Sequence, residues 1–336
     1  MAKAGIIGAG SWGCALASVL DKNGHQVTIW SVMEQEVAML KEKHEHVEKL
    51  PGVKLSEAIT FTTDLKEAVD GMDFLVLAVP SAFTRSTAKK MASYVGKNQI
   101  IVSVAKGIEE DSLMTLTEII EEEIPQADAA VLCGPSHAEE VGRGLPTTIV
   151  AGARSKQTAE YIQSVFMNEV FRVYTSPDVL GMELGGALKN VIALAAGMAD
   201  GLGYGDNTKA ALITRGIAEI ARLAVRMGAN PETLNGLTGI GDLIVTCASR
   251  HSRNRKAGML MGQGLTMQQA MDEVKMVVEG VYSAKAAIAL GKKYQVSMPI
   301  IEQVNQVLFE NKPAKDAVTE LMLRDKRSEY TTLEWG

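Results

Sequence analysis

Cysteine, histidine and aromatic residues are scarce in this chain. Of its 336 residues only three are cysteines, Cys14, Cys133 and Cys247. They are far apart in the sequence and form no closely spaced pair. This argues against a disulfide framework or a zinc site and fits a reducing compartment. The five histidines are scattered, so no metal site is expected. His44 and His46 stand in a charged segment and are expected to face solvent.

An excess of positive charge and a long hydrophobic run are also missing. The 34 Lys and Arg against 40 Asp and Glu give a net charge of −6, so a nucleic-acid partner is not expected. The longest apolar helical stretch, residues 191–198, is too short to span a bilayer. Residues 4–13 are too short and too rich in glycine for a signal peptide. With 46% hydrophobic residues, the composition predicts a globular, cytoplasmic protein of about two domains without membrane insertion.

A glycine pattern lies at the start of the chain, between an apolar run at 4–7 and a helical stretch at 14–20. Its glycines, Gly8, Gly10 and Gly13, enclose Ser11 and Trp12. In a strand–turn–helix unit the first glycine permits the turn, the second admits a pyrophosphate, and the third lets the helix pack closely. The free N–H groups and the helix dipole favour phosphate charge. The pattern therefore predicts a dinucleotide site, with an ordinary strand-to-helix turn as the alternative.

Strands and helices alternate through the first half of the chain. Short apolar strands are predicted at 4–7, 26–30, 59–62, 74–78, 100–103 and 130–133. Helices are predicted between them, at 12–23, 34–49, 64–69, 83–95 and 112–123. Two more strands, 147–151 and 171–175, flank a helix at 155–167 and extend the sheet. This order predicts a parallel, doubly wound sheet covered on both faces.

The pattern changes after Pro177, where the period of the apolar residues becomes helical. Helices are predicted at 187–198, 209–227, 231–235, 241–247, 254–262, 266–274, 281–294, 299–309 and 313–322. We therefore divide the chain into a dinucleotide-binding domain, 1–178, and a helical substrate domain, 179–336, whose charged tail, 325–336, is expected to be loosely ordered. Side chains of the second domain should complete a site at the carboxyl ends of the strands.

Polar or aromatic residues follow several predicted strands. Phe83 either packs on the cofactor or only begins a helix. Lys106 stands where a substrate phosphate or carbonyl would lie, unless it is a solvated surface lysine. Gly134 and Ser136 form a tight turn whose N–H groups are free for cofactor or substrate. His137 next to them could be an acid or base, but a helix cap or a solvent-facing residue is the favoured interpretation.

The second domain contains a lysine in an otherwise apolar helix. Lys189, followed by Asn190, is costly to bury unless it is paired or its pKa falls, and a lysine titrating near neutrality is a good general acid or base. Asp242 and Thr246 are four residues apart and share one helix face. Asp242 could pair with Lys189 and orient it. The alternatives are a lysine that reaches the helix edge and an aspartate that only caps a helix.

A basic run at residues 250–255 precedes a predicted helix in this acidic protein. It holds three arginines together with Ser252 and Asn254. Arginine beside a helix N-terminus suits a small dianion such as a phosphate monoester, and a solvated loop is the alternative. Further along, Glu279 either reaches a cofactor ribose or carboxamide or is only a charge at a helix start.

Taken together, these features resemble the NAD(P)-dependent glycerol-3-phosphate dehydrogenases, in particular the soluble bacterial type. The resemblance covers nearly the whole chain. It depends on GAGSWG at 8–13, AKG at 105–107, CGPSHA at 133–138, GALKN at 186–190, GIGDL at 239–243, SRN at 252–254 and VEG at 278–280. It implies an α/β Rossmann-type doubly wound sheet followed by an all-helical C-terminal domain, as in 6-phosphogluconate-dehydrogenase-like proteins.

The resemblance also implies roles for individual residues. Lys189 matches the proton acceptor and donor, and Asp242 would orient it. The substrate would be bound by Lys106, Gly134, Ser136, Lys189, Asp242, Ser252, Arg253 and Asn254. The dinucleotide would be bound by Gly8, Gly10, Ser11, Trp12, Gly13, Lys106, Ala138, Arg253, Val277 and Glu279. The implied reaction is reversible hydride transfer between NAD(P)H and dihydroxyacetone phosphate, giving sn-glycerol 3-phosphate for phospholipid synthesis.

The choice between NAD and NADP stays open at this point. An acid at the end of the second strand would hold the ribose 2′-hydroxyl of NAD, and an arginine would accept the 2′-phosphate of NADP. In the segment that follows the second predicted strand, the first acid is Glu34 and the first basic residue is Lys41. Many bacterial relatives carry basic or histidine residues in this segment. We expect NAD or NADP, with a preference for NAD.

Other functions compete with this interpretation. A related two-domain dehydrogenase of β-hydroxy acids or ketopantoate would share the glycine loop and the helical domain. A dinucleotide-sensing regulator would need the loop but not the pair of Lys189 and Asp242. Thiol chemistry at Cys133 or Cys247 is not favoured, because neither has a partner at a suitable spacing. A homodimer is expected, since the second domain is helical and rich in Ala and Met.

Overall fold

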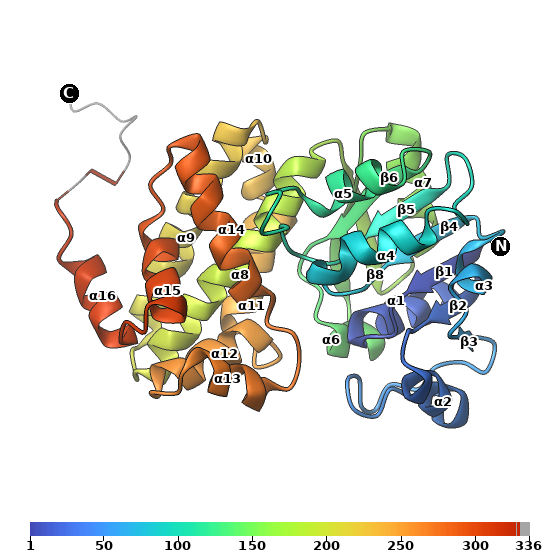
Figure 1. The fold of residues 1–336 in the computed structure, drawn as a ribbon, viewed down its shortest axis with the longest axis horizontal. Helices are drawn as coiled ribbons and strands as arrows, with labels where there is room; N and C mark the ends of the chain where they lie inside the picture. The colour runs from blue at the N-terminus through green and yellow to red at the C-terminus, as the bar shows by residue number, and fades with distance from the viewer. Residues whose placement is uncertain (327, 330–336) are drawn as a thin grey trace.

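Two parts lie side by side in the computed structural model, a sheet covered by helices and a group of helices (Figure 1). The structure describes residues 1–326, 328 and 329. The expectation of a loose tail falls mostly on residues 327 and 330–336, which lie outside this range. The chain passes from sheet to helices between Ser176 and Val179. The division into two domains at residue 178 remains a prediction.

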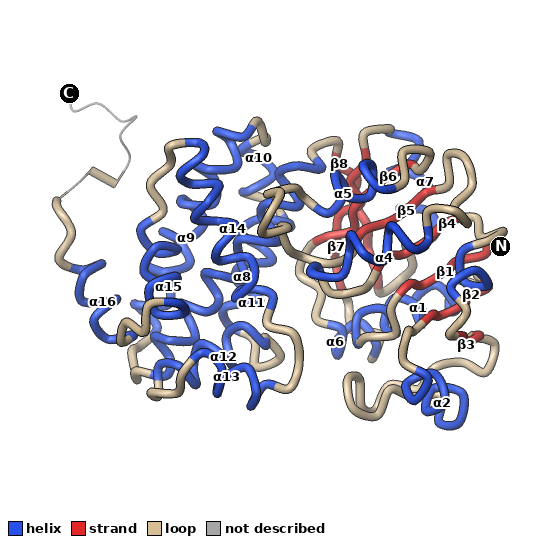
Figure 2. Tube along the Cα trace, viewed as in Figure 1, coloured by secondary structure: helices blue, strands red, loops and turns tan. Residues whose placement is uncertain are grey.

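The strands of the first part form one eight-stranded sheet in the order β3-β2-β1-β4-β5-β6-β7-β8 (Figure 2). Their bounds are β1 Lys3–Ile7, β2 Gln26–Trp30, β3 Thr60–Thr62, β4 Phe74–Leu77, β5 Ile100–Ser103, β6 Asp128–Cys133, β7 Thr147–Ala153 and β8 Phe171–Ser176. The central strands are apolar and buried on both faces, as in the four residues of β4. The strand order reverses between β1 and β4, and such a switch point opens a crevice at the carboxyl ends of the strands.

The predicted sheet is confirmed except for one pairing. β6 and β7 run antiparallel, whereas the other neighbouring pairs run parallel. The prediction of a purely parallel sheet is therefore wrong at this position. Only the short helix α6, Ala138–Gly142, separates the two strands, so the chain turns back on itself instead of crossing over the sheet.

The helices around the sheet follow the predicted positions, but three are shorter than predicted: 34–49 becomes 34–43, 83–95 becomes 84–91 and 112–123 becomes 116–123. Their bounds are α1 Ser11–Lys22, α2 Glu34–Lys43, α3 Leu65–Val69, η1 Ser81–Phe83, α4 Thr84–Met91, α5 Leu116–Glu123, α6 as above and α7 Lys156–Phe166. α2 stops well before residue 49 because His44 is left-handed, with φ 47°. The chain then turns inward and buries His46, which is 1% exposed. The prediction that His46 faces solvent is wrong.

The second part is built around one long helix, α8 Val179–Gly201. The other helices are α9 Asp206–Met227, α10 Pro231–Leu234, α11 Asp242–Ala248, α12 Arg253–Gly262, α13 Met267–Val274, α14 Glu279–Tyr294, α15 Pro299–Phe309 and α16 Ala314–Met322. Helices α9, α11, α12 and α14 all pack on α8, which passes through the middle of the group (Figure 1). Over the residues that the structure describes, this confirms the all-helical second half.

Helix α8 is longer than the predicted 187–198. Its first turns contain Gly185 and Gly186, which favour a loop by propensity. Tertiary packing overrides this, because a Cβ on Gly185 would lie 2.6 Å from the Thr238 carbonyl oxygen and one on Gly186 would lie 2.9 Å from Cys133 Sγ. Among the described helices, α8 alone has the length and composition to cross a membrane, but 89% of its apolar window is buried inside the protein. That burial is typical of a core helix.

Candidate functional site

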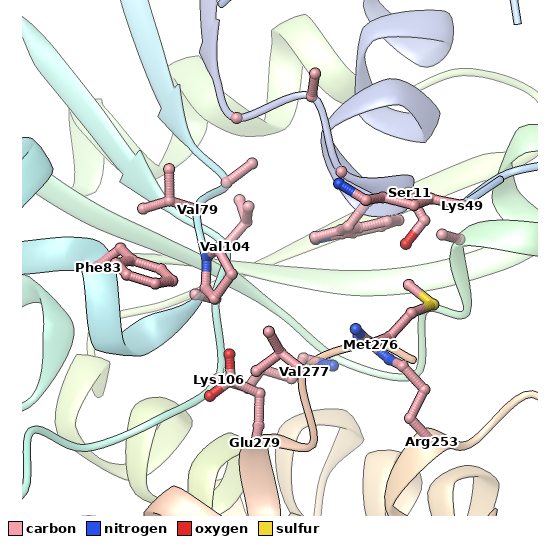
Figure 3. Close-up of a pocket in the computed structure, with 18 of the residues that line it drawn as sticks. Ser11, Lys49, Val79, Phe83, Val104, Lys106, Arg253, Met276, Val277 and Glu279 are labelled. Carbon is pink, nitrogen blue, oxygen red and sulfur yellow. The ribbon is translucent and has the colours of Figure 1, made fainter. Parts of the chain in front are cut away.

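A cavity of about 1090 Å³ opens where the carboxyl ends of β1, β4, β5 and β6 face the helices (Figure 3). In this view Ser11 and Lys49 lie on the side of the sheet. Arg253 and Glu279 come from the helices opposite, and Val277 from the loop before α14. The predicted site residues that line it are Gly8, Gly10, Ser11, Trp12, Lys106, Ser136, Ala138, Lys189, Asp242, Ser252, Arg253, Asn254, Val277 and Glu279. Gly13 and Gly134 are not among the residues that line it.

The glycine turn after β1 has the geometry that a dinucleotide needs. Gly8 has φ 123°, and a Cβ there would lie 2.8 Å from the backbone of Ala78. A Cβ on Gly13 would lie 2.1 Å from the Gly8 carbonyl oxygen, so helix and turn touch. A Cβ on Gly10 would meet nothing within 4 Å, and no side chain caps the N-terminus of α1. Open space and free N–H groups at Gly10 fit the pyrophosphate of a dinucleotide.

Across the cavity, a buried carboxylate is held between two lysines. The Lys189 ammonium donates to Asp242 Oδ1 at 2.5 Å and to Thr246 Oγ1 at 2.6 Å. Lys106 donates to the other oxygen, Oδ2, at 2.6 Å, and to the Gly134 carbonyl at 2.9 Å. Lys189 is 4% exposed and Asp242 1%. The pairing of Lys189 with Asp242 that the sequence suggested is present, and the Lys106 contact with the same carboxylate was not foreseen.

The three charges set one another's pKa values. Burial lowers the pKa of Lys189, Asp242 opposes this, and the charge of Lys106 lowers it further, to about 8. Burial alone would also lower the pKa of Lys106, but Asp242 outweighs it and holds that pKa above its usual value. Burial would raise the pKa of Asp242, yet the two ammonium groups lower it. Lys189 is therefore the member of the group that can exchange a proton near neutral pH.

A π-helical turn, η2 Leu237–Gly241, leads into α11 and places Asp242 at the first turn of that helix. A Cβ on Gly239 would lie 2.0 Å from the Leu234 carbonyl oxygen, so only glycine fits the turn. Asp242 and Thr246 lie one helical turn apart, and Thr246 Oγ1 donates back to the Asp242 carbonyl at 2.6 Å. Irregular turns of this kind often mark functional positions.

Asparagine side chains tie three helices together beside this group. Asn254 Nδ2 donates to Asn190 Oδ1 at 2.9 Å, and Asn254 Oδ1 accepts from the Gly280 N–H at 2.8 Å. Asn190 Nδ2 points to the Lys106 carbonyl at 3.3 Å. Asn254 lines the cavity as predicted, while its amide also joins α8, α12 and α14. Ser136 is bound locally, with its hydroxyl donating to the Gly134 carbonyl at 2.9 Å.

Of the three arginines in the basic run, only Arg253 lines the cavity. Arg255 turns away and donates to Asp200 Oδ2 at 2.6 Å, and Arg250 is exposed outside the lining. The prediction that the whole cluster holds an anion is wrong for these two. Ser252 caps α12 by accepting from the Arg255 N–H at 3.2 Å. Arg253 and the N-terminus of α12 together offer positive charge to the cavity.

At the end of the cavity near the glycine turn lies a polar group that sequence reasoning missed. Glu36 accepts hydrogen bonds from Ser31, from His46 at 2.8 Å and from Lys49 at 2.5 Å. Burial alone would raise the pKa of Glu36, but bonds from His46, Lys49 and Ser31 lower it to about 2. Glu36 and Lys49 both line the cavity. The local sequence carries no signal for this group, because the chain returns to it only after α2 ends early.

Three further predicted positions are placed by the structure. The Glu279 carboxylate accepts from the Ser81 N–H at 3.0 Å and from the Ser81 hydroxyl, so it links α14 to η1 while lining the cavity. Phe83 lines the cavity and is 56% exposed. His137 lines it as well and makes no cap hydrogen bond with its side chain. His137 thus occupies the N-cap position of α6, as the favoured interpretation has it, but its ring faces the cavity instead of capping the helix.

Neither cysteine near the site has the character of a nucleophile. Burial raises the pKa of Cys133 to about 11 and that of Cys247 to about 12, so both thiols stay protonated at neutral pH. Within residues 1–326, 328 and 329, no group of three or more His, Cys, Asp or Glu side chains is placed to hold a metal ion.

A glycine turn at the switch point of a doubly wound sheet, facing a buried lysine of near-neutral pKa, defines a dinucleotide-dependent dehydrogenase. Family models for the N-terminus and the C-terminus of NAD-dependent glycerol-3-phosphate dehydrogenase match residues 3–159 and 178–319. The chain belongs to this family and is an NAD(P)-dependent oxidoreductase.

Curated relatives are similar over the full length. A protein of Agathobacter rectalis, named glycerol-3-phosphate dehydrogenase with NAD(P)+ as cofactor, is 74% identical over 335 residues, or 100% of each chain to the nearest per cent. One of Fusobacterium nucleatum with the same name is 61% identical, over 98% of this chain and 99% of that one.

Solved structures agree with the observed fold. A glycerol-3-phosphate dehydrogenase from Coxiella burnetii superposes with a TM-score of 0.93 at 35% identity, over 96% of this chain and 99% of that chain. A ketopantoate reductase from Ralstonia eutropha reaches a TM-score of 0.61 at 16% identity, over 95% of this chain and 99% of that chain. The second likeness concerns the fold alone.

Proposed function

We propose that this chain transfers a hydride reversibly between a nicotinamide dinucleotide and dihydroxyacetone phosphate, giving sn-glycerol 3-phosphate. The observation that carries the proposal is the buried Lys189, held by Asp242 with a pKa of about 8, in the same cavity as the glycine turn. The names of the full-length relatives support the choice of substrate. The turn at Gly8 and Gly10 would hold the phosphates of a bound dinucleotide, which would supply or accept the hydride.

The proton is handled by Lys189. As the ketone is reduced, negative charge develops on the carbonyl oxygen, and a lysine ammonium within hydrogen-bond reach stabilises this charge and donates its proton. In the reverse direction, neutral Lys189 takes the proton of the 2-hydroxyl. Asp242 orients the ammonium through its 2.5 Å hydrogen bond. The charge of Lys106 keeps the pKa of Lys189 low enough for the group to work in both directions.

In this proposal the phosphate of the substrate binds at the N-terminus of α12, next to Arg253. Arg253 lines the cavity at the N-terminus of α12, and no hydrogen bond to its side chain is found within the described chain. A guanidinium beside a helix N-terminus suits a phosphate dianion. Binding energy from this remote phosphate then orients the small reacting end against Lys189.

NAD is the preferred cofactor in this proposal. Lys49 is the basic side chain near the expected ribose position, and its charge is matched by the buried Glu36. It is therefore not a free cation for a 2′-phosphate. NADPH should bind no tighter than NADH. Titrations of the two cofactors side by side test this, and a strong preference for NADPH would refute it.

The activity is tested by oxidation of NADH and NADPH with dihydroxyacetone phosphate, using the wild type, Lys189→Ala and the exposed control Lys256→Ala. We expect turnover in the wild type and the control, and a loss of about a hundredfold or more in Lys189→Ala with dinucleotide binding intact. No turnover of the wild type with either cofactor would refute the assignment.

The same assay with other substrates, together with the binding measurement, separates the competing functions. Turnover of ketopantoate or a β-hydroxy acid instead of dihydroxyacetone phosphate would identify the related dehydrogenase class. Loss of dinucleotide binding, rather than of turnover, in Lys189→Ala would favour a dinucleotide-sensing regulator.

The cellular setting is also part of the proposal. We propose that the protein acts in the cytoplasm, as a homodimer, and supplies glycerol 3-phosphate for phospholipid synthesis. Light scattering of the purified protein tests the dimer. A depletion experiment in which added glycerol restores growth would support the role in lipid synthesis.

A further inference from the structure

One polar side chain in the cavity has no role in the mechanism above. His137 follows β6 and occupies the N-cap position of α6, yet its ring does not cap that helix. The ring lines the cavity, and its Nε2 atom is buried without a hydrogen-bond partner within the described chain. A buried ring nitrogen without a partner is costly, so a ligand that supplies one is favoured.

The surroundings place this ring on the substrate side of the cavity. Its centroid lies 6.0 Å from that of His251, which directly precedes the cap of α12. It also faces the backbone of Val245 on α11, the helix that carries Asp242. The charges of Lys189 and Lys106 act on it. The ring therefore lies beside the lysine group and the start of α12.

The ring is neutral at physiological pH. Burial, and then the charges of Lys189 and Lys106, lower the pKa of His137 to about 4. A neutral imidazole has one donor and one acceptor nitrogen but no charge. It is therefore poorly suited to a phosphate dianion and well suited to a hydroxyl group, which can also both donate and accept.

Dihydroxyacetone phosphate has three polar parts, and two of them are already matched. The phosphate suits Arg253 with the start of α12, and the carbonyl suits Lys189. The terminal hydroxyl remains. We propose that the imidazole of His137 hydrogen-bonds this terminal hydroxyl, and that His137 thereby selects a hydroxymethyl ketone over a methyl ketone. The inference builds on the proposed function and adds a specificity-determining residue to it.

The test compares two substrates that differ only at this group, dihydroxyacetone phosphate and hydroxyacetone phosphate, in which a methyl group replaces the hydroxymethyl group. The variants are His137→Phe, which keeps a ring without nitrogen, and His137→Gln, which keeps a neutral donor and acceptor. We expect the ratio of kcat/KM for the two substrates to fall about tenfold in His137→Phe. It should fall clearly less in His137→Gln.

A binding measurement supplies an independent readout. The dinucleotide-bound protein is titrated calorimetrically with glycerol 3-phosphate and with propane-1,2-diol 1-phosphate, which lacks the terminal hydroxyl. The ratio of the two affinities should fall in His137→Phe as the ratio of kcat/KM does. Each variant is its own control, because a general loss of folding or of phosphate binding weakens both ligands equally and leaves the ratio unchanged.

Three outcomes would overturn the inference. Equal losses with both substrates would place the ring at the phosphate or in the structural framework. A changed affinity for NADH with an unchanged substrate ratio would place it at the nicotinamide. Unaltered ratio and affinities would mean that the ring touches neither ligand. Failure of the wild type to reduce dihydroxyacetone phosphate would instead refute the proposed function, so the two failures are distinguishable.

Discussion

Lys189 and Asp242, which are 53 residues apart in the chain, meet in a 2.5 Å ion pair with almost no exposure to solvent. Breaking a buried pair of this kind leaves an uncompensated charge and is strongly destabilising. Here the second oxygen of the same carboxylate is held by Lys106 at 2.6 Å. Two ammonium groups therefore share one carboxylate. The positive charge of Lys106 repels that of Lys189 and lowers the pKa of Lys189. The first two predictions follow from this relationship.

The pH dependence should be opposite in the two directions of the reaction. Reduction needs protonated Lys189, so its rate should be level below the pKa of about 8 and fall about tenfold per pH unit above it. Oxidation needs neutral Lys189, so its rate should rise with pH up to about 8 and then level off. Profiles of kcat in both directions test this. If kcat changed with pH in the same direction for reduction and oxidation, Lys189 would be excluded as the proton carrier.

Asp242→Asn should move these profiles to lower pH as well as slow the reaction. The substitution removes the carboxylate that raises the pKa of Lys189 and leaves the charge of Lys106 in place. Because Asp242 acts through Lys189, the shift of the profile distinguishes positioning from a general loss of structure. The exposed Asp316→Asn serves as the control. A slower enzyme with an unshifted profile would contradict this role for Asp242.

Glu36→Gln should change the choice of cofactor. Glutamine keeps the size of the side chain but removes the charge that matches Lys49 at 2.5 Å. Lys49 would then attract a 2′-phosphate, so the affinity for NADPH relative to NADH should increase about tenfold. Fluorescence titration with both cofactors measures this ratio, with the exposed Glu34→Gln as the matched control. An unchanged ratio would show that Lys49 does not reach the ribose.

Glu183 should make stability depend on pH. It is buried on α8 and accepts from the Thr117 N–H at 2.9 Å. Burial raises its pKa from 4.5 to about 7, and hydrogen bonds from Thr117 only partly oppose this. The folded state therefore binds the proton more tightly, so this stabilisation is complete below pH 4.5 and is lost as the pH rises through about 7.

Glu183→Gln should flatten this dependence. Glu219 is buried in the same way, with a pKa raised to about 7, and remains in the variant. Urea unfolding of the wild type and Glu183→Gln between these pH limits should show a smaller decline of the free energy of unfolding in the variant. Equal declines would mean that Glu183 does not titrate differently on folding.

Local sequence patterns determined much of this protein. The glycine turn at Gly8, Gly10 and Gly13, the alternation of strands and helices, and the change to helices after residue 176 all depend on short-range geometry. A glycine that must adopt a positive φ, or an apolar run with period 2 or 3.6, is visible within a few residues. The resemblance in seven short motifs likewise led to the correct family.

Tertiary structure alone decided which side chains meet. The first turns of α8 are helical because packing against Thr238 and Cys133 admits only Gly185 and Gly186, against their local propensity. Arg255 leaves the site because Asp200 binds it.

Segments distant in sequence also build both ends of the cavity. The group around Glu36 assembles because the chain folds back after α2, and Lys106, which follows β5, joins Lys189 on Asp242. Hydrogen bonds and charges act over a few ångströms in space, whatever the separation along the chain. For that reason the residue types of the site could be inferred from the sequence, whereas their partners and the resulting pKa values depended on the fold.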